Sequence, residues 1–143
     1  MTQELIAQAS IAISAPRSEV WSALVSPAAI RQYMFGTEVV SEWKKGSPIT
    51  WQGDWEGKPY KDKGTIVEIL RGQLLRYTHF SPLAGLADRP ENYHTVAIEL
   101  EDEGSDTRVT LTQDNNSSEE ARIHSEKNWG MMLGDLKKYL EGT

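Results

Sequence analysis

The chain has 143 residues, the usual length of one domain, and carries 21 acidic against 15 basic side chains for a formal net charge of −6. This balance argues against a surface that neutralises phosphates, so nucleic acid is not an expected partner. With no cysteine in the chain, a disulfide framework and a thiolate metal site are both excluded.

The sequence contains no segment that indicates a membrane span or secretion. No apolar run approaches the roughly 20 residues needed to cross a bilayer. The N-terminus lacks a basic region followed by an apolar segment and a cleavage site. We therefore expect a cytoplasmic protein, with one domain over residues 1–143 and no linker or repeat inside it.

The first part of the chain predicts one strand and two short helices. Apolar and polar side chains mostly alternate over residues 5–13, which is the period of a strand. Pro16 fits the start of a helix that we expect to end near Val25. Ser26 is a suitable N-cap, and Pro27 fits the first position of a helix. Together they predict a second helix that runs to about Tyr33.

The middle of the chain has the pattern of an antiparallel meander. Glycines within the short connections supply the flexible residue that tight turns often need. One connection is long, because residues 81–92 hold two prolines and a glycine, and such a loop is often a lid or a binding loop. The expected strands lie near residues 38–43, 48–55, 60–70, 73–80, 93–102 and 107–114.

The last segment predicts one long helix from Ser117 to Leu140. Ser117 is the expected cap, with Glu120 reaching back to it as in a capping box, and Gly142 is expected to end the helix. The C-terminal half carries an apolar stripe formed by Trp129, Met132, Leu133, Leu136 and Leu140. This helix is the one element long enough to cover the meander, so we expect the sheet to curl around it.

The N-terminal half of the same helix differs, because its inward positions Ser118, Arg122 and Ser125 are small or polar. We interpret this half as the mouth of a pocket. Aromatic side chains on the strands are the candidates to line it, since Trp51 and Trp55 share one face of their strand and should point at the helix. Simple core packing is the alternative interpretation of these rings.

Motifs for catalysis and metal binding are sparse. His79 is expected to face inward with Tyr77, where it could orient a bound group, act as a base or have only a structural role. No pair of histidines has the spacing of metal ligands, so no metal site is expected. Hydrolase, nucleotide and dinucleotide signatures are absent. Arg76 and Arg122 could meet an anionic ligand, or lie at the surface with packed stems.

Several segments together resemble a known superfamily. They are residues 13–24 (ISAPRSEVWSAL), Ser26-Pro27, residues 64–69 (GTIVEI), residues 107–112 (TRVTLT), and Trp129-Gly130 with the leucines that follow. Their order and spacing over nearly the whole chain resemble the START-like (SRPBCC, Bet v 1-like) superfamily. The most similar branch is that of the C-terminal domain of the heat-shock-protein-90 ATPase activator.

This resemblance implies an α+β helix-grip fold. In that fold a curved antiparallel sheet of six or seven strands wraps a long C-terminal helix around an apolar cavity, with two short helices after the first strand. The superfamily includes lipid and hormone carriers, polyketide cyclases, resistance proteins and co-chaperones. Fold analogy therefore does not choose among these functions.

Three hypotheses follow from the sequence. The first is a monomeric or homodimeric binding protein without cofactor, which holds a small apolar ligand behind a gate formed by residues 81–92. The second is a partner-binding module related to stress responses, with a chaperone ATPase as partner. The third is a cyclase or hydrolase with His79 as general base. The predicted ligand-binding residues are Phe35, Trp51, Trp55, Tyr77, His79, Gln113, Arg122, Trp129 and Met132.

Overall fold

The computed structural model describes residues 5–55, 57–82 and 85–142, without the side chain of Trp55. It confirms the expected order of strand, two helices, meander and long helix. The N-terminal elements are β1 (Ala7–Ile13), α1 (Arg17–Leu24) and α2 (Pro27–Tyr33). The meander comprises β2 (Glu38–Ser41), β3 (Pro48–Trp55), β4 (Lys58–Leu70), β5 (Leu74–His79), β6 (His94–Glu103) and β7 (Asp106–Gln113), and α3 (Glu119–Glu141) follows.

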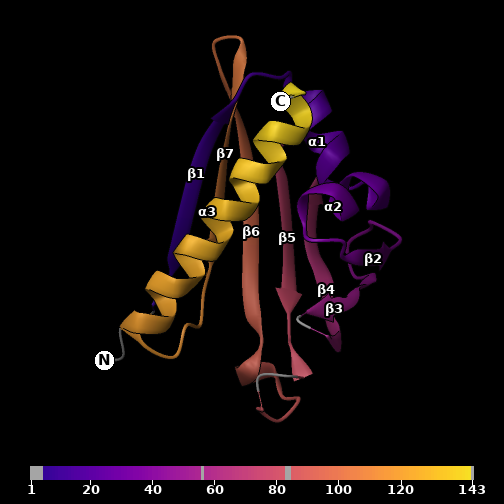
Figure 1. Ribbon diagram of the computed structural model, residues 1–143, viewed down its shortest axis with the longest axis vertical. Helices are drawn as coiled ribbons and strands as arrows, with labels where there is room; N and C mark the ends of the chain where they lie inside the picture. Colours follow the sequence, from indigo (N-terminus) through magenta and orange to yellow (C-terminus); the bar gives the residue numbers. More distant parts are fainter. Residues whose placement is uncertain (1–4, 56, 83–84, 143) are drawn as a thin grey trace.

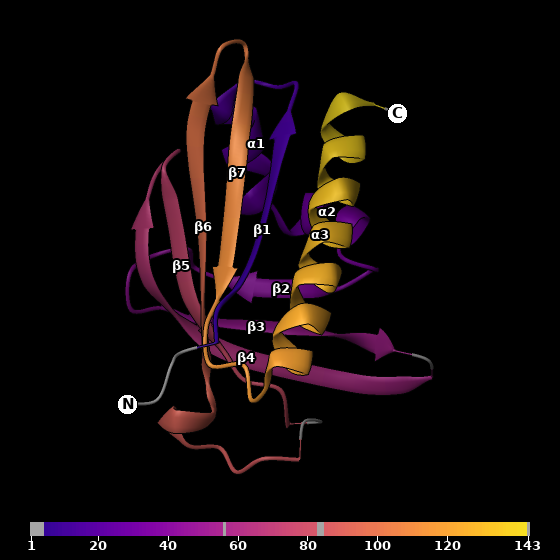
Figure 2. The same cartoon turned by 90° about the vertical axis from the view of Figure 1, so that its left-hand side faces the viewer.

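The strands form one seven-stranded antiparallel sheet in the order β1-β7-β6-β5-β4-β3-β2. Helix α3 lies diagonally across one face of this sheet (Figure 1). Figure 2 shows the curvature, since β2, β3 and β4 run across the direction of β1, β5, β6 and β7. This is the α+β helix-grip architecture that the sequence predicts.

The long strand β4 takes part in both halves of the curved sheet. Its pairing with β5 shifts register between Ile66 and Glu68, as at a β-bulge. At Gly64 the two strands approach so closely that a Cβ atom would lie 1.7 Å from the carbonyl oxygen of Thr78. Glycine is thus a steric requirement at this position.

Both ends of α3 are set by identifiable residues. Gly142 ends the helix in the left-handed conformation, with φ of 74°. At the start, the cap is Ser118, whose hydroxyl accepts a hydrogen bond from the Ala121 N–H at 3.1 Å, so the prediction of Ser117 as cap is wrong by one residue. The preceding turn is held by Asn116, which donates to the Leu5 carbonyl at 2.9 Å and accepts from Ser125, and the helix starts after it.

The core lies between α3 and the concave face of the sheet. Leu133 and Leu136 of α3 are 1% and 0% exposed, and they belong to one cluster with Val109 and Leu111 of β7. Helices α1 and α2 add their buried side chains to the same cluster. One internal contact joins these two helices, because the buried Tyr33 hydroxyl donates to the Ala23 carbonyl at 3.0 Å.

Side chains of α3 also reach the free edge of β1, the first strand of the sheet. Glu126 accepts from the Gln8 N–H at 3.0 Å, and Glu141 accepts from the Ser14 N–H at 2.8 Å. Between them, the Lys137 ammonium donates to a β1 carbonyl at 3.0 Å. Three backbone groups along β1 and the residue after it are therefore bound by the helix. Within the described residues, none of the helices is long and apolar enough to span a membrane.

Candidate functional site

A pocket of about 510 Å³ opens between α3, the end of α2 and strands β3 to β5. Aromatic side chains form much of its wall, and a few polar groups interrupt them. Its volume lies within the range of small-molecule sites, roughly 300–1,000 Å³. The lining residues are Met34, Phe35, Thr37, Trp51, Tyr60, Asp62, Tyr77, His79, Ser81, Asn128 and Trp129.

Trp51 is at the centre of the aromatic wall. Its ring lies 5.0 Å from that of Tyr77 and 5.1 Å from that of His79, measured between centroids. Tyr77 and His79 are two residues apart on β5, so they point to the same face, as predicted. Burial raises the pKa of the Tyr77 phenol, which keeps its proton at neutral pH.

The main polar feature of the pocket is a pair formed by Asp62 and His79. Asp62 is the cross-strand partner of Trp51, so both side chains project on the same face of the β3–β4 hairpin. The His79 Nε2–H donates to Asp62 Oδ2 at 2.8 Å. Only 16% of the Asp62 side chain is exposed, against 29% for His79.

His79 is held from its other side as well. Its ring stacks on that of His94, its partner on β6, with centroids 6.3 Å apart. His94 is fixed in turn because its Nδ1–H donates to the Asp114 carbonyl at 2.9 Å. The orientation of His79 is thus set by Trp51, His94 and Asp62 together.

Five of the predicted ligand-binding residues come together around this pocket. They are Phe35, Trp51, Tyr77, His79 and Trp129. Phe35 is 57% exposed and lies at the rim, after the end of α2.

The other predicted ligand-binding residues lie elsewhere. Gln113 lies behind the wall, where its Oε1 accepts from the Trp129 indole N–H at 2.5 Å. Met132 is 4% exposed and packs in the core. Arg122 forms ion pairs with Glu119 and, at 2.8 Å, with Glu126 on its own helix. The side chain of Trp55 falls outside the described part of the structure.

Sequence reasoning missed several residues of the pocket. Asp62 carried a usable signal, because it alternates on β4 with Ile66, a fully buried residue, and therefore points inward. Tyr60 carried the same signal, because it alternates with Asp62 on β4, whereas Thr37 lacked one because it lies between two elements. Their hydroxyl groups are hydrogen-bonded to each other at 2.6 Å. Asn128 of α3 and Ser81 of the loop complete the missed set with Met34.

The second half of the loop at residues 81–92 is attached to the sheet, partly through the adjacent Tyr93. The Tyr93 hydroxyl donates to Asp88 Oδ1 at 2.6 Å, and the Phe80 ring stacks on that of Tyr93 at 5.0 Å. Lys63 of β4 forms an ion pair with Asp88, and this contact lowers the pKa of the Asp88 carboxyl. Residues 83 and 84 lie outside the described residues, and the predicted role of this loop as a gate stays a prediction.

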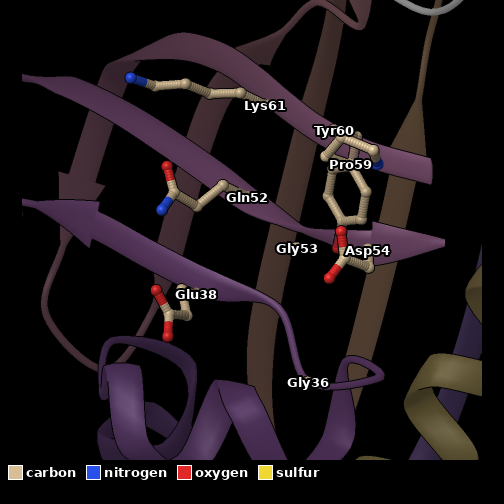
Figure 3. Close-up of a pocket in the computed structure, with 8 residues that line it drawn as sticks. All are labelled: Gly36, Glu38, Gln52, Gly53, Asp54, Pro59, Tyr60 and Lys61. Atoms are coloured by element: carbon tan, nitrogen blue, oxygen red, sulfur yellow. The ribbon is translucent and has the colours of Figure 1, made fainter. Parts of the chain in front are cut away.

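A second hollow of about 640 Å³ lies against the β2–β3–β4 part of the sheet (Figure 3). Glu38, Gln52 and Lys61 are cross-strand partners and project together on the face opposite Trp51. Their side chains are exposed, and most of this wall is polar. Tyr60 takes part in both hollows. An apolar ligand would bury more carbon in the pocket at Trp51, so we regard that pocket as the candidate site.

Comparisons with known proteins agree with the fold. Residues 14–141 match the family model described as Activator of Hsp90 ATPase homolog 1-like protein. Among solved structures, ChR145 from Cytophaga hutchinsonii is 54% identical over 99% of this chain and 97% of that chain, with a TM-score of 0.87. No match was found among curated proteins.

Two more distant structures share the fold. CalU16 from Micromonospora echinospora is 20% identical over 97% of this chain and 87% of that chain, with a TM-score of 0.72. The Aha1 dimer from Colwellia psychrerythraea is 18% identical over 95% and 96% of the two chains, with a TM-score of 0.73.

Proposed function

The chain belongs to the family of Activator of Hsp90 ATPase homolog 1-like proteins, within the START-like superfamily, and from its pocket we propose that it binds a small, largely apolar aromatic molecule. The observation that carries this proposal is the aromatic wall around Trp51. Rings in such a wall offer large contact areas and favourable stacking geometry to a flat ligand. A few polar groups among them would fix the orientation of that ligand.

In this proposal Trp51, Tyr77 and Trp129 supply most of the contact area, with Phe35 at the rim and His79 at the polar end. Gln113 and Met132 support the pocket from behind, the former through its hydrogen bond to Trp129. The ligand-binding roles of Trp55 and Arg122 remain predictions from the sequence.

The test is an NMR titration that follows the indole N–H signals. A panel of one- to three-ring aromatic compounds and medium-chain fatty acids is added to the protein. We expect saturable shifts of the Trp51 and Trp129 signals with at least one aromatic compound. Trp21 serves as an internal control, because it is 7% exposed in α1 and does not line the pocket. A panel without any saturable shift would contradict the proposal.

A blocking variant makes the test specific to the pocket. Ser81 lines the pocket, so Ser81→Phe should fill part of it and weaken binding at least tenfold. The matched control is Ser105→Phe, which introduces the same ring at an exposed position in the turn between β6 and β7. Equal affinities of the two variants would argue that the compounds bind elsewhere.

The alternative function is that of a partner-binding module acting on a chaperone ATPase. Its support is the family description and the Aha1 relative, and no geometry of the described residues adds to it. The same variant separates the two functions. Stimulation of a bacterial Hsp90 ATPase by the Ser81→Phe protein, at the level of the unmodified protein, would favour the surface-acting alternative.

A further inference from the structure

One atom in the wall of the pocket has an unmet hydrogen-bonding capacity. The two carboxylate oxygens of Asp62 differ, because Oδ2 accepts from His79 while Oδ1 is buried and has no hydrogen-bond partner in the protein. Across the described residues, Oδ1 is the one buried side-chain nitrogen or oxygen in this state. A buried acceptor without a donor costs roughly 1–3 kcal/mol, more when it is charged, so such an atom calls for a functional explanation.

The donors around the pocket are largely directed elsewhere. The hydroxyl groups of Thr37 and Tyr60 share one hydrogen bond, and the indole N–H of Trp129 is engaged by Gln113. The His79 Nε2–H is already used on the other oxygen of the same carboxylate. Rotation of Asp62 towards a new partner would break this last bond. The carboxylate is therefore held by His79, while Oδ1 accepts no hydrogen bond from any of these donors.

From this arrangement we propose that Asp62 Oδ1 accepts a hydrogen bond from a hydroxyl group of the ligand, and that the ligand class is therefore hydroxylated aromatics such as phenols and naphthols. The inference rests on the proposed binding function and specifies its ligand. The aromatic wall holds the ring, and Asp62 binds the hydroxyl at the polar end. His79 is a positioning residue that keeps the carboxylate in place.

The number of donors favours a hydroxyl over an ammonium group. An ammonium brings three N–H donors, whereas the one carboxylate of the pocket wall has a single oxygen without a partner. The other two N–H groups would face a wall made largely of aromatic carbon, where attraction to the ring faces replaces their hydration only in part. A phenolic hydroxyl brings a single donor. It matches the single acceptor and keeps the rest of the ligand apolar.

The test compares two ligands that differ in one hydrogen-bond donor. 2-Naphthol and 2-methoxynaphthalene share the same rings, but the methyl ether has no donor. Calorimetric or NMR titrations at neutral pH should show that the protein binds 2-naphthol roughly ten- to a hundredfold more tightly. In the Asp62→Asn variant an amide replaces the carboxylate, and the preference should fall below about threefold. The matched control is Asp102→Asn, which changes an exposed carboxylate on β6 and should keep the preference for 2-naphthol.

The outcomes separate this inference from the function on which it rests. If both naphthalenes bind to the unmodified protein with equal affinity, the role of Asp62 is refuted while the binding function stands. The same conclusion follows if Asp62→Asn keeps the full preference. If neither naphthalene binds but other panel compounds do, the ligand class is wrong. If no compound binds at all, both proposals fail. The ligand pair on the unmodified protein remains decisive even if Asp62→Asn does not fold.

Discussion

Replacing Gly64 by alanine is the most direct test of how closely the curved sheet is packed. The added Cβ atom would lie 1.7 Å from the Thr78 carbonyl oxygen, whereas real Cβ contacts are essentially never shorter than 3.0 Å. Strands β4 and β5 would have to move apart by more than about an ångström at this point. The obstacle is backbone, so no side-chain rotation can relieve it.

The cost of this movement follows from the hydrogen bonds beside Gly64. Lys63 and Phe80 exchange two backbone bonds of 3.0 and 2.8 Å, and the Thr65 N–H donates to the Thr78 hydroxyl at 3.0 Å. Each such bond contributes about 0.5–1.5 kcal/mol net. Losing all three would destabilise the fold by about 1.5–4.5 kcal/mol. This is a large fraction of the roughly 5–15 kcal/mol that stabilises a typical domain.

Urea denaturation followed by circular dichroism measures the effect, with the slope against urea as a check on two-state behaviour. Gly130→Ala is the matched control, because Gly130 is exposed within α3 and a Cβ there meets nothing within 4 Å. Alanine should stabilise the helix at that position by roughly 0.5–1 kcal/mol. A Gly64→Ala protein that unfolds at the same urea concentration as the unmodified protein would refute the packing argument.

Two further predictions concern α3 and its contacts. Gln113→Ala removes the acceptor for the Trp129 indole N–H, so we expect a loss of about 1–2 kcal/mol in the free energy of unfolding and weaker ligand binding. The control is Gln52→Ala at an exposed position, which should change neither the free energy of unfolding nor ligand binding. For Glu141, hydrogen bonds from Lys137 and from the Ser14 backbone N–H, just after β1, lower the carboxyl pKa below its ordinary value of 4.5. Its stabilising effect is therefore complete above about pH 4.5 and lost as the pH falls through the lowered pKa. The melting temperatures of the unmodified protein and of Glu141→Gln should thus converge in acid, and a constant difference would count against this reasoning.

Most of the fold could be predicted because its signals are local. The alternation of β1, the serine and proline at the start of α2 and the apolar stripe of α3 each depend on neighbouring residues only. The error at Ser117 shows the limit of this approach. Asn116 sets the start of α3 through its bond to Leu5, more than a hundred residues away in the chain. A local pattern cannot contain that contact.

The candidate site was only partly predictable for a related reason. Aromatic residues on one strand face, such as Trp51 and Tyr77, follow from alternation alone. The pairing of Asp62 with His79 joins β4 to β5 near Gly64, where the strands curve, so it depends on the three-dimensional path of the sheet. Arg122 shows the opposite case, because its partner Glu126 is four residues away on the same helix and could have been recognised from spacing.

The contacts between α3 and β1 also bear on how this protein would aggregate. An uncovered edge strand is a template for pairing with other chains. Glu126, Lys137 and Glu141 bind three backbone groups along the edge of β1 and the residue after it. These three residues lie on the same helix that closes the core. Detachment of α3 would therefore uncover the apolar interior and a strand edge in a single event. Conditions that loosen the end of α3 should thus lead directly to aggregation, and amide exchange at Gln8 and Ser14 would report its onset.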